Sequence, residues 1–272
     1  MEGTLGRVRT VAAALAGLVL GVMPGAPREA AAVVGGQEAA PGAYPYVAAL
    51  VDVERHRQFC GGALIGTRHV LTAAHCLSGS YADTRRVAVL LGDHDLRTAT
   101  ESRHARVARP VRFTVHPGYD SRTQHDDLAV ITLSDPVRPD AGVRPIALPT
   151  PAETFDHTRL EAVGWGATAF GEGPSPVLRT VTLDTVPHAA CARRDVGPLT
   201  PAQLCTWTPG RDTCVYDSGG PLSHRTGTGR PVLAALVSYG RGCATDTPAV
   251  NTRITSHLAW IARTTGVRPP AA

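Results

Sequence analysis

Short runs of β-branched and aliphatic residues constrain the fold of this chain most strongly. Each run is only a few residues long, and Gly, Pro, Asn or Asp separates it from the next. Across residues 177–186 alternate positions differ in character, which is the period of a half-buried strand. Many short strands with turn residues between them predict an all-β sandwich or barrel. The expected strands are Val47–Val53, His69–Thr72, Val87–Leu91, Leu128–Leu133, Leu160–Trp165, Val177–Val186, Val232–Tyr239 and Val250–Ile254.

One helix is expected, near the C-terminus. Thr255 or Ser256 can cap its start and Gly266 can end it. The apolar residues that would share one face are Ile254, Leu258 and Ile261.

The chain divides into segments of different character. Residues 33–266 form the expected folded domain, and residues 267–272 form a C-terminal tail that we expect to be frayed. Residues 133–151 contain five prolines, which makes this stretch the best candidate for a linker between two β halves.

Residues 1–32 have the layout of an export signal. Arg7 and Arg9 precede an apolar stretch from Val11 to Met23, and small residues follow as far as Ala32. The apolar stretch is short for a membrane anchor, so we expect a cleaved signal peptide and a secreted protein. Two cleavage positions stay open: cleavage after Ala32, or earlier cleavage that leaves a short propeptide 27–32.

Six cysteines fit an exported protein. An even count suggests three disulfides, but the count alone permits many connectivities. No Cys-x-x-Cys pair occurs, which argues against a zinc site. The net charge is +4 and the arginines are scattered, which argues against nucleic-acid binding.

Three polar residues lie in segments that suit a role in catalysis. Ser218 is followed by Gly219 and Gly220, which allow a tight turn that exposes the hydroxyl and collects backbone N–H groups. His75 precedes a cysteine, and its ring can shuttle protons near neutrality. Asp127 leads an apolar run, where a buried acid needs a partner such as an imidazole. Each residue alone also fits an ordinary turn, surface or strand-end position.

Together, these segments resemble the trypsin-like (chymotrypsin-fold) serine peptidases over essentially all of residues 33–261. The order His75, Asp127, Ser218 is the order of that family's triad. The supporting motifs are Val33-Val34-Gly35-Gly36, Phe59-Cys60-Gly61-Gly62-Ala63-Leu64-Ile65, Val163-Gly164-Trp165-Gly166 and Val237-Ser238-Tyr239-Gly240.

The resemblance implies two six-stranded antiparallel β-barrels with the active site between them and a C-terminal α-helix. It also implies a serine nucleophile, Ser218, with His75 as base and Asp127 as its partner. The oxyanion hole would use the backbone N–H groups of Tyr216 and Ser218. The implied disulfides are Cys60–Cys76, Cys191–Cys205 and Cys214–Cys243, each worth about 2–4 kcal/mol.

By the same resemblance, Asp212 forms the floor of the specificity pocket and favours arginine or lysine in the substrate. The other implied substrate-binding residues are Thr213, Ser238, Gly240 and Ala249. The resemblance also pairs the new α-amino group of Val33 with Asp217, so that the pocket forms after cleavage. The implied partners are protein or peptide substrates and proteinaceous inhibitors. We expect a monomer without cofactors, nucleic acid or membrane association after signal removal.

This sequence departs from the family at several positions. Tyr216 replaces a glycine beside the oxyanion hole, and Ala249 replaces a glycine in the pocket. Asp93 and Asp95 lie where trypsins begin a calcium loop, but Thr100 and Arg103 replace acidic residues there, so we expect no metal ion.

Two alternatives stay open. The first is a non-catalytic homologue that serves as a binding module. It stays open because Tyr216 replaces the glycine beside the oxyanion hole. The second is a peptidase that prefers aromatic or small residues, which requires Asp212 to lie away from the pocket floor.

Overall fold

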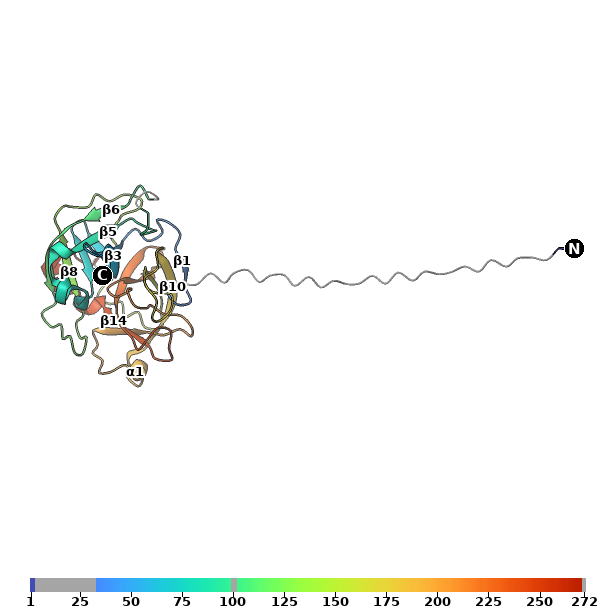
Figure 1. The fold of residues 1–272 in the computed structure, drawn as a ribbon. Coiled ribbons are helices and arrows are strands. Elements are labelled where there is room, and N and C mark those ends of the chain that lie inside the picture. The colour runs from blue at the N-terminus through green and yellow to red at the C-terminus, as the bar shows by residue number, and fades with distance from the viewer. Residues whose placement is uncertain (3–32, 99–101, 271–272) are drawn as a thin grey trace.

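The computed structural model describes residues 1–2, 33–98 and 102–270. Almost all of the expected signal segment 1–32 lies outside these residues. The described chain forms two antiparallel sheets, each of seven strands. Figure 1 shows the first sheet in blue to green beside the second in yellow to red.

The first sheet closes into a ring of six strands, because two of its seven strands continue one another. β6 pairs with β5 and β7 pairs with β8, with only Arg109 between β6 and β7. The strands are β2 (Val47–Asp52), β3 (Arg57–Gly66), β4 (His69–Thr72), β5 (Val87–Leu91), β6 (Arg106–Ala108), β7 (Pro110–Val115) and β8 (Ala129–Leu133).

The second sheet closes where β9 pairs with both β12 and β10, and the two-residue β1 adds to β10 outside this ring. The fold prediction of two six-stranded barrels is therefore confirmed. The strands are β1 (Gln37–Glu38), β9 (Arg159–Gly164), β10 (Arg179–Val186), β11 (Gln203–Thr206), β12 (Pro221–Arg225), β13 (Pro231–Tyr239) and β14 (Ala249–Arg253).

The eight expected strands all occur, with ends shifted by at most two residues. The periodicity of the sequence did not predict β1, β3, β6, β7, β11 and β12. In β6 and β7 only the first residue of β7 is fully buried, so neither strand carries the apolar alternation that marks a half-buried strand. The segment between β8 and β9 contains all of the expected linker except Leu133, which ends β8, and this segment has no strand.

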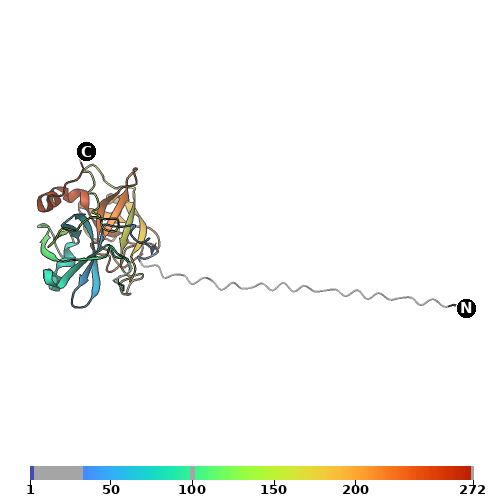
Figure 2. The same ribbon diagram turned by 90° about the horizontal axis from the view of Figure 1, so that it is seen from above.

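The C-terminal helix α2 (Leu258–Thr265) follows the 3-10 helix η4 (Ile254–His257). The prediction that Thr255 or Ser256 caps the start of this helix was wrong, because both residues lie inside η4 and no side chain caps α2. Gly266 ends α2 as expected, with φ +75° and its N–H donating to Ala262 O at 2.9 Å. Figure 2 shows α2, in red, beside the first barrel. Shorter helices are η1 (Ala74–Leu77), η2 (Gly79–Ala82), η3 (Thr84–Arg86) and the unexpected α1 (His188–Cys191).

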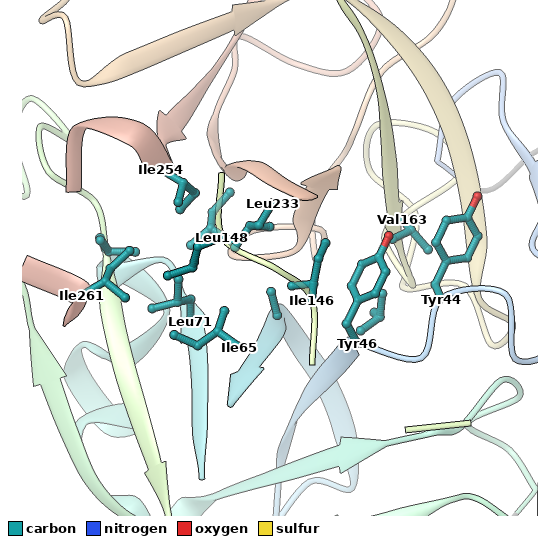
Figure 3. Close-up of a cluster of buried hydrophobic side chains, with 14 of the residues drawn as sticks. Tyr44, Tyr46, Ile65, Leu71, Ile146, Leu148, Val163, Leu233, Ile254 and Ile261 are labelled. Carbon is teal, nitrogen blue, oxygen red and sulfur yellow. The ribbon is translucent and has the colours of Figure 1, made fainter. Parts of the chain in front are cut away.

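Each barrel has an apolar interior, and a third cluster fills the space between the barrels and α2. Figure 3 shows this third cluster, in which Ile65 and Leu71 of the first barrel approach Leu233 of the second. Val267, in the expected tail, also packs against it, so the tail is not frayed at its first residue. Because burial of apolar surface is the dominant stabilising term, this cluster fixes the barrels against each other and sets the geometry of the cleft.

Candidate active site

His75 and Asp127 meet at one end of the first barrel. η1 presents His75 directly after β4, and Asp127 lies just before β8, which pairs with β4. The His75 Nδ1 atom is 2.7 Å from Asp127 Oδ2, and the His75 backbone N–H donates to Oδ1 at 2.9 Å. Asp127 is fully buried. The carboxylate therefore fixes both the position and the tautomer of the ring, with a proton on Nδ1 and the lone pair on Nε2.

Ser238 on β13 adds a second-barrel contact to the same carboxylate. Its hydroxyl donates to Asp127 Oδ2 at 2.6 Å. The sequence assigned Ser238 to substrate binding and did not predict this bond. Since the bond crosses between the barrels, the orientation of His75 depends on how the two barrels pack.

The Ser218 turn lies against the first barrel through small residues. Gly61 N–H donates to Ser218 O at 2.8 Å, and the Cys76 sulfur is 3.6 Å from the same oxygen. Gly219 has φ +75°, and a Cβ on it would lie 2.2 Å from Thr72 Oγ1. Only glycine fits there, so the turn predicted from the sequence also serves close packing.

The structure thus brings Ser218 beside the disulfide that adjoins His75. Among the described residues, no hydrogen bond joins the Ser218 hydroxyl to the His75 ring. In enzymes without substrate this contact is often long and tightens in the reacting complex. The three predicted residues therefore lie close to one another, with His75 and Asp127 already hydrogen-bonded and Ser218 next to Cys76.

Tyr216 adopts the left-handed conformation of the glycine that it replaces, with φ +77°. No described residue accepts a hydrogen bond from the backbone N–H of Tyr216 or of Ser218. Two neighbouring free N–H groups beside a nucleophile suit an oxyanion.

Two residues that the sequence did not indicate hold Tyr216 in place. Gln58 donates its side-chain N–H to Tyr216 O at 2.8 Å and to Cys60 O at 3.0 Å. The Arg57 guanidinium lies 4.9 Å from the centre of the Tyr216 ring and donates to its hydroxyl. No local motif marks Gln58 or Arg57, because their partner is distant in the sequence.

A cavity of about 220 Å³ opens beside Ser218. Asp212 is buried in its wall and accepts a hydrogen bond from Ala244 N–H at 3.0 Å. Burial raises the pKa of Asp212 to about 6, because no described cation pairs with it. The expected substrate-binding residues that line this cavity are Asp212, Thr213, Ser238, Gly240 and Ala249.

Asp217 is a second buried acid behind the Ser218 turn. Its two oxygens accept from Gly166 N–H at 2.8 Å and Cys214 N–H at 3.0 Å. Burial raises its pKa to about 7, against the lowering effect of those bonds. Val33 is also buried, in the apolar interior of the second barrel, with φ +52°.

The described chain contains three disulfides and no free cysteine. They join Cys60 to Cys76, Cys191 to Cys205 and Cys214 to Cys243, which are the pairs that the resemblance implied. The first bridge supports His75 and the third supports the wall of the cavity that holds Asp212.

The segment of the expected calcium loop is only partly described, since Thr100 lies outside the described residues. Arg97 binds Asp95 through two guanidinium nitrogens, at 2.9 Å and 2.5 Å. This ion pair gives the Asp95 carboxylate a cationic partner from the protein itself. In the described part of the chain, no helix is long and apolar enough to span a membrane.

Known proteins resemble the chain over this whole domain. A family model for trypsin matches residues 33–261. A venom serine protease of Polistes dominula is 34% identical over 84% of this chain and 83% of its own length. Brachyurin of Leptuca pugilator is 36% identical over 87% of this chain and 100% of its own length. Kallikrein-14 of Homo sapiens is 34% identical over 85% of this chain and 84% of its own length. The match spans 65% of the proclotting enzyme of Tachypleus tridentatus. The chain therefore belongs to the trypsin family and is a serine endopeptidase.

Proposed function

We propose that this endopeptidase cleaves peptide bonds on the carboxyl side of arginine and lysine. The buried carboxylate of Asp212 carries the proposal, because it lies in the cavity next to Ser218 without a salt bridge to any described residue. A buried charge of this kind needs a cation, and a substrate guanidinium or ammonium group supplies one. The aliphatic stem of such a side chain suits the apolar part of the cavity wall.

The bond is broken by acyl transfer. The Ser218 hydroxyl attacks the scissile carbonyl carbon while His75 Nε2 takes the hydroxyl proton. Asp127 holds the ring and balances the charge that forms on it. His75 then gives the proton to the leaving amine, and water repeats the sequence on the acyl-enzyme, which releases the acid and restores Ser218.

The free N–H groups of Tyr216 and Ser218 stabilise the negative oxygen of the tetrahedral intermediates. The left-handed backbone at Tyr216 supports this role, because it is the conformation that a glycine would otherwise supply. Strain of roughly 1–3 kcal/mol is expected for a non-glycine residue there. The contacts from Gln58 and Arg57 offset it.

Activation depends on a new N-terminus at Val33. An ammonium group on Val33 would give Asp217 the cation that it lacks, and the paired charges would lock the Ser218 turn and the pocket wall. The burial of Val33 supports this role. Cleavage after Ala32 by the export machinery would produce the group directly, and the protein would then act outside the cell on protein or peptide substrates. N-terminal sequencing of the exported protein tests this step.

Cleavage-site profiling on a peptide library tests the proposed specificity. The mature protein should cut after Arg and Lys and leave Phe and Ala sites intact, and the Ser218→Ala variant should cut nothing. Equal cutting after Phe and Arg would remove the assignment to basic residues.

A serine-directed phosphonate separates catalysis from mere binding. We expect covalent labelling at Ser218 of the mature protein. An unlabelled, folded protein would favour a non-catalytic binding module, for which the strained Tyr216 is the structural argument.

A further inference from the structure

Two histidines and an aspartate cluster where the loop between β7 and β8 meets the C-terminal helices. His116 directly follows β7, Asp126 lies shortly before β8, and His257 ends η4. One ligand atom from each lies within 4.8 Å of the other two. His257 Nε2 is 2.9 Å from Asp126 Oδ1, and His116 Nδ1 is 3.9 Å from Asp126 Oδ2.

His257 has an oxygen acceptor on each side of its ring. Its Nδ1 is 2.8 Å from the Arg253 carbonyl oxygen, which can only accept, so Nδ1 carries a proton. In the neutral ring Nε2 then has a lone pair, and this lone pair faces the Asp126 carboxylate. The side chain is only 3% exposed, so water does not relieve this contact. A metal ion at Nε2 would give this lone pair and the Asp126 carboxylate a shared positive partner.

His116 turns its Nδ1 atom toward the same carboxylate. The Gly118 backbone N–H donates to His116 Nδ1 at 3.2 Å, so Nδ1 is the unprotonated nitrogen, and a metal ion at Nδ1 would replace this hydrogen bond. The neutral ring is the form that binds metals.

The distances from His257 and His116 to the Asp126 carboxylate oxygens are near the ligand spacing of a tetrahedral zinc site. Zinc bonds of about 2.0–2.1 Å to nitrogen and oxygen place neighbouring ligand atoms about 3.3 Å apart. The observed separations, 2.9 Å from His257 Nε2 to Oδ1 and 3.9 Å from His116 Nδ1 to Oδ2, fall on either side of that value. The Arg253 carbonyl, which receives the other N–H of His257, is the outer-shell partner that metal-bound histidines usually have.

The cluster is reachable from solvent on one side. The Asp126 side chain is 30% exposed and that of His116 is 17% exposed. Gly118 keeps the approach open, because a Cβ there would lie 2.5 Å from Asp126 Oδ2 and 3.3 Å from His116 Nδ1. Water can therefore complete the coordination.

We propose that His116, Asp126 and His257 bind one zinc-like divalent transition-metal ion. Two imidazoles and one carboxylate form a nitrogen and oxygen ligand set that suits this class of ion and not calcium. The ion ties the β7–β8 loop to η4 and stabilises the junction of the first barrel with the C-terminal helices. The proposal replaces the expectation of a chain without a metal ion, which was argued only from the segment of Asp93 and Asp95.

Zinc titration of the full chain carrying Ser218→Ala, which cannot digest itself, tests the site by calorimetry and thermal unfolding. We expect one ion per chain and a midpoint that rises by roughly 5 °C at a Zn²⁺ concentration about 100 times Kd. His116→Ala and Asp126→Asn, each in this background, should weaken binding by more than about 100-fold, since changes to outer-shell partners alone cost about 10- to 100-fold.

His125→Ala is the matched control, because His125 is in the same loop but its Nε2 is 3.1 Å from Pro198 O. It should bind zinc like the parent, and metal-free unfolding curves establish that each variant is folded. Absence of zinc binding by the parent would overturn the proposal and leave a protonated His257 paired with Asp126. Parent-like binding by both folded ligand variants would also overturn it and place the ion elsewhere, for example at His75.

Discussion

Asp127 and Asp217 are both buried carboxylates near Ser218, the proposed nucleophile, but their surroundings differ. Asp127 receives two hydrogen bonds from His75 and one from the Ser238 hydroxyl. Asp217 receives two backbone N–H groups and pairs with no described cation. The proposed catalytic pair of His75 and Asp127 on the first barrel is thus complete within the continuous chain. The acid on the second barrel lacks a counter-charge, which a new N-terminus at Val33 would provide.

The largest expected effect comes from a substitution in the hydrogen-bonded pair of His75 and Asp127. Asp127→Asn keeps the shape but changes the tautomer that the carboxylate imposes on His75, so kcat should fall on the order of 10⁴-fold. Steady-state kinetics on an arginyl peptide substrate measures this fall. Asp135→Asn, an exposed acid beyond β8, is the control and should retain parental rates. A fall of less than tenfold in Asp127→Asn would contradict the assigned role.

Asp212→Ser should lower kcat/KM for arginyl substrates by about 150- to 5,000-fold, since loss of a buried ionic partner costs about 3–5 kcal/mol. Rates on substrates with uncharged residues should change little, which a paired kinetic comparison shows. Asp246→Ser alters an exposed acid of the neighbouring loop and serves as the control. Equal losses on charged and uncharged substrates would place Asp212 outside the specificity pocket.

The unpaired state of Asp217 predicts a pH dependence of stability in the uncleaved chain. Its folded pKa of about 7 lies above the ordinary value of 3.8, so the folded chain binds more protons between those pH values. The free energy of unfolding should therefore decrease as pH rises from 4 to 7, on the order of 3 kcal/mol. Asp212, with its raised pKa, contributes in the same direction.

Denaturant unfolding of the uncleaved Ser218→Ala chain at several pH values measures this decrease. Asp217→Asn in the same background should remove the larger part of it, and the protein with a free Val33 should lack it as well. A decrease that persists unchanged in Asp217→Asn would assign the titration to another group.

A smaller effect is expected where Tyr216 replaces glycine. Tyr216→Ala keeps the left-handed backbone but loses the ring contact with Arg57, whereas Tyr216→Gly removes the backbone strain. The alanine variant should therefore be less stable than the glycine variant by about 1 kcal/mol in denaturant unfolding. Equal stabilities would show that the backbone at residue 216 is not strained.

The smallest expected effect is in the pocket wall. Ala249→Gly removes one methyl group from the cavity that holds Asp212, so the ratio of arginine to lysine cleavage should change by less than about tenfold. Competition between paired peptides that differ only in this residue measures the ratio. A larger change would mean that Ala249 contacts the substrate charge, which a methyl group cannot do favourably.

Local patterns in the sequence predicted the positions of eight strands. Strand positions followed from runs such as Val87–Leu91, because alternation and turn residues act over a few neighbours. The ring of six strands in the first barrel did not, because β6 and β7 have little apolar alternation and join the sheet only through β5 and β8. The N-terminus of α2 was also missed, since η4 supplies its first turn in place of a side-chain cap.

The sequence by itself determined the identity of the chemical groups: a serine in a glycine-rich turn, a histidine beside a cysteine, and an acid at the head of a strand. Only the tertiary structure decided which groups meet. Gln58 on Tyr216 O, Ser238 on Asp127 and the cluster of His116 with His257 each join residues more than 100 positions apart. Such contacts form when the barrels and the C-terminal helix pack together, and no short-range pattern encodes them because burial of apolar surface, which drives that packing, is non-directional.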